Sequence, residues 1–138
     1  MRNYTTDEQG NEVTNYMTSD GDFNTVYSYL ISGDPCPENI QAVTDCQLLV
    51  IEREQFFQLK NASNQFGLII EKLVADGLEC KELRLKSYLT EDAQKRYANL
   101  IHRQPKVVQF TPMKYIASYL GITRETFSRI RNRKLSIK

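Results

Sequence analysis

Residues 124–132 hold the densest group of side chains that could recognise another molecule. Five polar side chains share one side of a helix drawn through this segment: Arg124, Glu125, Ser128, Arg129 and Asn132. Phe127 and Ile130 share the opposite side. In the major groove of DNA, an arginine can donate two hydrogen bonds to guanine, a glutamate can accept one from cytosine, and an asparagine can pair with adenine. The pattern predicts a helix with an apolar back and a polar, cationic front that suits this groove.

Two short helices separated by a glycine must position these side chains. Thr111 can cap the first helix, and Pro112 fits its first position. Gly121 can end that helix because it reaches positive φ easily, and Thr123 can cap the second helix. This order is typical of a helix-turn-helix whose second helix enters the major groove. The alternative is an ordinary helical hairpin with a solvated basic face.

Charge is divided unequally along the chain. The net charge of the 138 residues is only +1. Residues 1–80 contain 4 Lys and Arg against 13 Asp and Glu, whereas residues 81–138 contain 14 against 4. Since binding to nucleic-acid phosphates depends on local positive charge, we expect an acidic module followed by a basic one that contains the helix pair.

Other kinds of site leave no pattern in the sequence. Cys36, Cys46 and Cys80 are widely spaced, which favours buried thiols in a reducing cytoplasm over a zinc site or disulfides. No apolar run approaches the length of a membrane span, so we expect no membrane partner and a cytoplasmic location. We also find no nucleophile–base pair, paired carboxylates, phosphate loop or metal-ligand cluster, and expect neither an enzyme nor a cofactor.

The N-terminal part favours short antiparallel strands. Four are expected, at residues 2–6, 12–18, 39–43 and 46–51. The first two flank a turn at 7–11, and a loop rich in glycine and proline occupies 32–37. Residues 23–31 are compatible with either a strand or a helix. The close spacing of the strands indicates part of an antiparallel barrel or sandwich.

From residue 52 the apolar residues follow a helical period. Helices are expected over residues 52–59, 65–87 and from about 90 to 102, with a connector at 104–110. Five residues of the long helix predict a two-fold seam between two chains: Phe66, Ile69, Ile70, Leu73 and Gly77. The alternative is packing on the sheet of the same chain, and both arrangements can hold for different faces.

The order of these elements resembles the Crp/Fnr superfamily, the cyclic-AMP receptor type of transcription regulator. Its recognition helix carries Arg, Glu and Thr followed by a further Arg, as do residues 124–129 here. The resemblance implies that Arg124, Glu125 and Arg129 read bases and that Thr126 contacts a phosphate. Ser128 lies on the same face and is grouped with the base-reading residues.

Two departures from the family qualify the resemblance. Family members have several strands before a segment like residues 2–18, so relative to them the chain is N-terminally incomplete. Their nucleotide pocket uses Gly-Glu and then an Arg-Ser pair. Gly21-Asp22 resembles the first part, but the second falls near Cys36-Pro37, where residues 33–43 hold no cation. We therefore expect an effector other than cyclic AMP.

The sequence thus predicts an α+β protein in three parts. These are a partial antiparallel jelly roll of the cyclic-nucleotide-binding type (1–60), a long dimerisation helix (61–88) and a helix-turn-helix domain (89–138). We expect a homodimeric, sequence-specific DNA-binding regulator. Six residues are expected to contact the DNA backbone: Thr126, Lys106, Lys114, Arg131, Arg133 and Lys134. The alternative is a ligand-sensing or protein-interaction dimer module that does not bind DNA.

Overall fold

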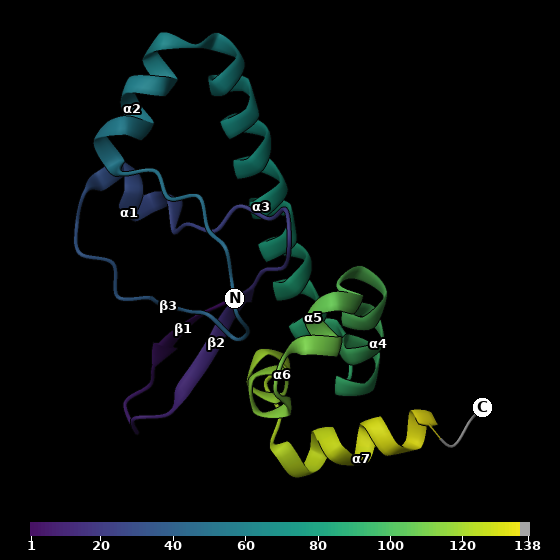
Figure 1. Ribbon diagram of the computed structural model, residues 1–138. Helices are drawn as coiled ribbons and strands as arrows, with labels where there is room; N and C mark the ends of the chain where they lie inside the picture. The colour runs from purple at the N-terminus through teal and green to yellow at the C-terminus, as the bar shows by residue number, and fades with distance from the viewer. Residues whose placement is uncertain (136–138) are drawn as a thin grey trace.

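The computed structural model describes residues 1–135, and the side chains of residues 1–132. A small antiparallel sheet is followed by a series of helices in an α+β arrangement (Figure 1). The strands are β1 (Arg2–Thr6), β2 (Glu12–Met17) and β3 (Asn39–Gln41). The helices are α1 (Tyr27–Ser32), α2 (Arg53–Ala62), α3 (Asn64–Thr90), α4 (Ala93–Arg103), α5 (Pro105–Phe110), α6 (Met113–Leu120) and α7 (Arg124–Leu135). Figure 1 shows α2 and α3 as an arm that extends away from the sheet and from α4–α7.

The sheet has the strand order β2-β1-β3, and both pairs are antiparallel. The N-terminal hairpin is confirmed, and in its turn Asp7 Oδ1 accepts hydrogen bonds from the backbone N–H groups of Gln9 (3.0 Å) and Asn11 (2.7 Å). The strand expected at 46–51 is wrong, because no described strand pairs with these residues and Leu49 is fully exposed. The described residues therefore form a three-stranded sheet, smaller than the jelly roll expected.

Three helix boundaries differ from those expected. Helix α3 continues through Thr90, where the next helix was expected to begin. That helix, α4, is capped by Asp92, whose Oδ1 accepts from the N–H of Lys95 at 2.8 Å. The segment expected as a connector is the short helix α5, whose first residue is Pro105, a position where the missing N–H costs nothing. Pro112 takes the cap position of α6, so the cap expected from Thr111 is wrong.

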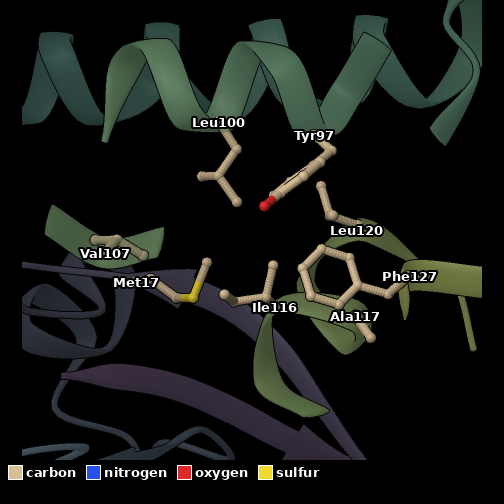
Figure 2. Packing of buried hydrophobic residues seen from close by; sticks show 8 residues of the cluster. All are labelled: Met17, Tyr97, Leu100, Val107, Ile116, Ala117, Leu120 and Phe127. Carbon is tan, nitrogen blue, oxygen red and sulfur yellow. The ribbon is translucent and has the colours of Figure 1, made fainter. Parts of the chain in front are cut away.

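The hydrophobic core lies among the C-terminal helices and extends to the sheet. Its members are Met17, Tyr97, Leu100, Val107, Ile116, Ala117, Leu120 and Phe127. Figure 2 shows Tyr97 and Leu100 pointing from α4 toward side chains of α6 and α7, with Met17 of β2 on the far side. The rings of Tyr97 and Phe127 meet edge to face, with centroids 4.9 Å apart. Burial of these residues holds α4, α5, α6 and β2 together around the base of α7.

Polar contacts fasten the sheet to α6. The hydroxyl of Ser118 donates to Glu12 O (3.1 Å) and accepts from the N–H of Thr14 (2.9 Å). Arg2 is fully buried, and its guanidinium lies 3.6 Å from the ring centroid of Tyr115 on α6. The same guanidinium donates to Thr14 Oγ1 at 3.2 Å and forms an ion pair with Glu12. The N-terminal sheet and the C-terminal helices are thus in direct contact.

Helix α3 divides its apolar residues between two environments. Ile70 is buried, and the ring centroid of Phe66 lies 5.7 Å from that of Phe56 on α2. These two residues of the predicted seam therefore pack within the chain. Ile69 and Leu73 remain exposed. A Cβ at Gly77 would meet nothing within 4 Å, because no described part of the same chain approaches it. In the described part of the chain, α3 included, no helix is both long and apolar enough to cross a membrane.

Gly121 ends α6 with φ of +67°, and a Cβ built on it would lie 2.8 Å from Cε1 of Tyr88. We expect Gly121→Ala to lower the free energy of unfolding by roughly 1–2 kcal/mol through the left-handed backbone, and further through this contact. Urea denaturation followed by circular dichroism measures the change. Gly67→Ala is the control, because Gly67 lies inside α3 with open space around it, and we expect a gain of roughly 0.5–1 kcal/mol. Equal effects of the two substitutions would contradict this account of Gly121.

Candidate nucleic-acid interface

Helix α7 is oriented by its cap and by one buried ring. The Thr123 hydroxyl accepts from the N–H of Thr126 at 3.2 Å, which confirms the predicted cap. Phe127 is 1% exposed and Ile130 packs against the same core. Because side chains on a helix repeat every 3.6 residues, burial of Phe127 turns the residues on its opposite side outward.

The four predicted base-reading residues lie together on the outer face of α7. Arg124, Glu125, Ser128 and Arg129 line one shallow, open depression, and Met113 of α6 completes it. Arg124, Glu125 and Arg129 are exposed, and Ser128 is half-buried. Met113 was not predicted, and only the turn between α6 and α7 brings it there. The depression presents two guanidinium groups and one carboxylate to solvent.

Hydrogen bonds fix the positions of two groups in this depression. Arg129 Nη2 donates to the Thr126 hydroxyl at 3.2 Å, and the two hydroxyls of Thr123 and Thr126 are 3.1 Å apart. The pKa of Glu125 is lowered, first by its own backbone N–H, then by the Thr123 hydroxyl, with smaller contributions from Arg124 and Arg129. At neutral pH the carboxylate is therefore an acceptor only, which is the state that a cytosine amino group requires.

The predicted backbone-contacting residues are dispersed. Arg131 donates to Met113 Sδ at 3.1 Å and so borders the depression, whereas the Lys114 ammonium lies 4.6 Å from the Tyr115 ring centroid. The Lys106 ammonium is paired with Asp20 at 3.2 Å, an exposed ion pair that salt and competing phosphates can break. Thr126 is half-buried at the start of α7. The side chains of Arg133 and Lys134 lie outside the described residues.

A second cationic group, Arg53, was missed by sequence reasoning because it is 20 residues from the loop that it contacts. A Cβ on Gly33 would lie 3.3 Å from Arg53 Cζ. The guanidinium donates to Leu30 O and Ile31 O, both at 2.9 Å, and so satisfies carbonyls at the end of α1. Arg53 thus supplies a cation beside residues 33–43, a stretch that has none of its own.

The comparisons with known proteins concern the N-terminal part of the chain. Residues 1–63 match the family model for the cyclic nucleotide-binding domain. The match ends within the turn between α2 and α3, and it includes all three strands. The comparison with curated proteins found no match. Residues 1–63 are therefore a cyclic-nucleotide-binding-like domain.

Removal of the Phe127 ring should release α7 from the core. We expect Phe127→Ala to cost about 3–5 kcal/mol of unfolding free energy, because the ring is fully buried against Tyr97. Ser128→Ala, the next residue and on the outer face, should change the same quantity by no more than about 0.5 kcal/mol. Urea unfolding of both variants tests this. A small effect of Phe127→Ala would mean that α7 is not held by this packing.

Proposed function

We propose that this protein is a sequence-specific DNA-binding transcriptional regulator that acts as a homodimer. The observation that carries the proposal is the outer face of α7, where Arg124, Glu125, Ser128 and Arg129 line one depression while Phe127 fixes the helix from behind. A helix that presents these groups and is anchored by its apolar back has the chemistry for reading a major groove.

The neighbouring charges favour the same partner. The part of the chain from residue 81 onward contains 14 Lys and Arg against 4 Asp and Glu. Lys114 on α6 and Arg131 on α7 are both exposed, and a cation beside a bound groove can pair with the phosphates that flank it. In this proposal the exposed α7 residues read bases, and these cations set the register along the duplex.

Dimerisation is proposed through the exposed face of α3. Six large apolar residues of this helix remain exposed in the single chain: Leu68, Ile69, Leu73, Leu78, Leu85 and Leu89. Two of these, Ile69 and Leu73, are four residues apart and share one side of the helix. A two-fold pairing would place two α7 helices in successive major grooves, about 34 Å apart. Exposed apolar side chains that share one side of a helix, as Ile69 and Leu73 do, are typical of an interface between protein chains.

The N-terminal domain suggests that a small molecule regulates DNA binding. Residues 1–63 are cyclic-nucleotide-binding-like. We propose an effector other than cyclic AMP, since the two cations that contact residues 33–43 in the described structure are already engaged. Arg53 donates to the carbonyls of Leu30 and Ile31. Arg2 donates to Gln41 Oε1 at 2.8 Å and is paired with Glu12. Contacts between this domain and α6, such as Arg2 on Tyr115, offer a route by which an effector would act on the helix pair.

One observation favours a second candidate function. Leu48, Leu49, Val50 and Ile51 form a continuous exposed apolar run in the acidic half of the chain. Such a run suits a protein partner, and the alternative is therefore a ligand-sensing or protein-interaction dimer module that does not bind DNA. A salt titration of binding to random duplex DNA separates the two: a steep fall of affinity with salt supports the regulator, and absence of binding at low salt supports the alternative.

Substitutions at Arg124 and Lys114 should affect DNA binding differently. We expect Arg124→Ala to cost about 1–3 kcal/mol at selected sites and to relax preference at one base position. Lys114→Ala should weaken binding to all duplexes about equally and lower the salt slope by about one. Selection of bound sites from random duplexes, followed by affinity measurements at several salt concentrations, tests both. The same sequence-independent loss in both variants would contradict the assignment of Arg124.

Charges introduced into the exposed face of α3 should dissociate the dimer. Burial of an Ile or Leu side chain contributes about 1.5–3 kcal/mol, so Ile69→Glu/Leu73→Glu should raise the dimer dissociation constant by at least about 100-fold. Analytical ultracentrifugation measures it. Leu49→Glu is the control, because Leu49 is fully exposed and outside α3. A wild-type chain that stays monomeric at high micromolar concentration would refute the dimer, without refuting groove binding by a single α7.

A further inference from the structure

A cleft of about 390 Å³ lies where the end of α3 meets α4 and α6, apart from the depression on α7. Its volume falls within the range of about 300–1,000 Å³ that is usual for small-molecule sites. Four basic side chains line it: Arg84, Lys86, Arg96 and Arg103. The one acidic residue in its wall, Glu91, accepts a hydrogen bond from Asn99 at 2.9 Å and pairs with Lys95 at 3.6 Å. The cleft therefore carries an excess of positive charge.

Two of these arginines have hydrogen-bonding capacity left over. The Nε atoms of Arg84 and Arg96 are buried, and within the described part of the chain neither has an acceptor. A buried N–H without an acceptor is unfavourable and rare in native proteins, and a bound ion or water is one of the things that accounts for it. Both side chains line the cleft, Arg84 from α3 and Arg96 from α4, so two incompletely bonded guanidinium groups lie in the wall of one space.

The remaining nitrogens of these arginines bond to neutral acceptors. Arg84 donates to the backbone carbonyls of Thr14 (3.2 Å), Tyr119 (3.1 Å) and Asn15. Arg96 donates to those of Glu91 (2.6 Å) and Leu120 (3.1 Å). These bonds fix the positions of the guanidinium groups but leave their charges unbalanced. No ion pair to either group occurs among the residues that the structure describes.

Aromatic rings form part of the wall of the cleft and make it less polar. Tyr119 lies 4.2 Å and Tyr88 5.3 Å from the Arg84 guanidinium, measured to the ring centroids, and Arg96 lies 5.0 Å from Tyr88. Burial raises the pKa of Tyr119 to about 12. An anion that enters such a wall interacts with the guanidinium charges more strongly than it would in bulk water.

We propose that this cleft binds a small phosphorylated molecule, with its phosphate between Arg84 and Arg96. Phosphate oxygens match the planar donor geometry of guanidinium groups, and here a phosphate would offset both charges, with a small shift of each side chain bringing its Nε–H within reach of a phosphate oxygen. Lys86 and Arg103, both exposed, would add charge at the rim, while Asn99 and Ser87 supply polar groups for the rest of the molecule. The proposal does not depend on DNA binding.

Occupation of the cleft would act on the junction between the two halves of the chain. Arg84 on α3 already donates to β2 through Thr14 and Asn15, and to α6 through Tyr119. A phosphate that fixes Arg84 and Arg96 together would therefore stiffen the contact of α3 with both β2 and α6. Such a site links the long helix to the helix pair.

Pyrophosphate is the probe for the test, titrated into the full chain at constant ionic strength with chloride as the reference salt. Two-dimensional ¹H–¹⁵N spectra resolve arginine Nε–H signals, and we expect those of Arg84 and Arg96 to shift with one saturable curve, at a Kd of about 1 mM or below. The thermal unfolding midpoint should rise over the same concentrations. Absence of a saturable shift at both signals would overturn the proposal.

Variants at the rim keep the test informative, because Arg84 and Arg96 support the fold and their replacement risks unfolding. Lys86→Gln/Arg103→Gln removes two exposed charges from the rim, and we expect pyrophosphate to bind about tenfold more weakly. Lys72→Gln/Lys81→Gln is the matched control, since it removes two exposed charges of α3 outside the cleft. Equal affinities of the two double variants would exclude the cleft as the binding site.

A final arm separates a free phosphorylated molecule from the phosphates of DNA. Duplex DNA is added in place of pyrophosphate, and the same two Nε–H signals are followed. We expect them to stay unchanged, since the proposed ligand is small and enters a cleft away from α7. A response to DNA but not to pyrophosphate would overturn the proposal and assign the cleft to the nucleic-acid backbone.

Discussion

Burial of the Phe127 ring is the constraint on which the C-terminal part of the structure depends. The ring fills a space between Tyr97 of α4 and the apolar residues of α6, and it is almost fully removed from water. Once this position is fixed, the helical period decides that Arg124, Glu125 and Arg129 face solvent. Gly121 contributes the second part of the constraint, since its positive φ lets α7 leave α6 in the direction that brings Phe127 inward. Burial of Phe127 in the apolar core thus determines which polar side chains of α7 face solvent.

Arginines play a different part, because they join elements that share little apolar surface. Arg2 joins the sheet to Tyr115 of α6, and Arg84 joins α3 to β2 and to Tyr119. Met17 is the one residue of the sheet in the main core cluster. The contact between the N-terminal domain and the helices therefore includes guanidinium groups bonded to carbonyls and stacked on rings, together with the hydrogen bonds of Ser118 to Glu12 and Thr14. Hydrogen bonds of this kind are directional, so they restrict the orientation of each element relative to the other.

Much of the helical part could be predicted from local patterns. The cap by Thr123, the turn at Gly121 and the apolar side of α7 follow from residue types and spacing, because each is set within one or two helical turns. The same applies to the hairpin around Asp7. The strand expected at 46–51 was wrong for the complementary reason: a strand needs a partner to pair with, and local composition does not supply one. Likewise, the helical spacing of the predicted seam residues could not show that Phe66 and Ile70 would pack against the same chain.

The sequence by itself determined the face of α7, since Arg124, Glu125 and Arg129 on one side and Phe127 on the other follow from helical geometry alone. Only the tertiary structure decided that Met113 borders that face, that Arg53 approaches Gly33, and that Arg84 and Arg96 converge on one cleft. These groups are separated in the sequence by 11 to 20 residues. Their meeting depends on how whole helices pack, because packing is governed by the summed burial of many side chains and not by any local pattern.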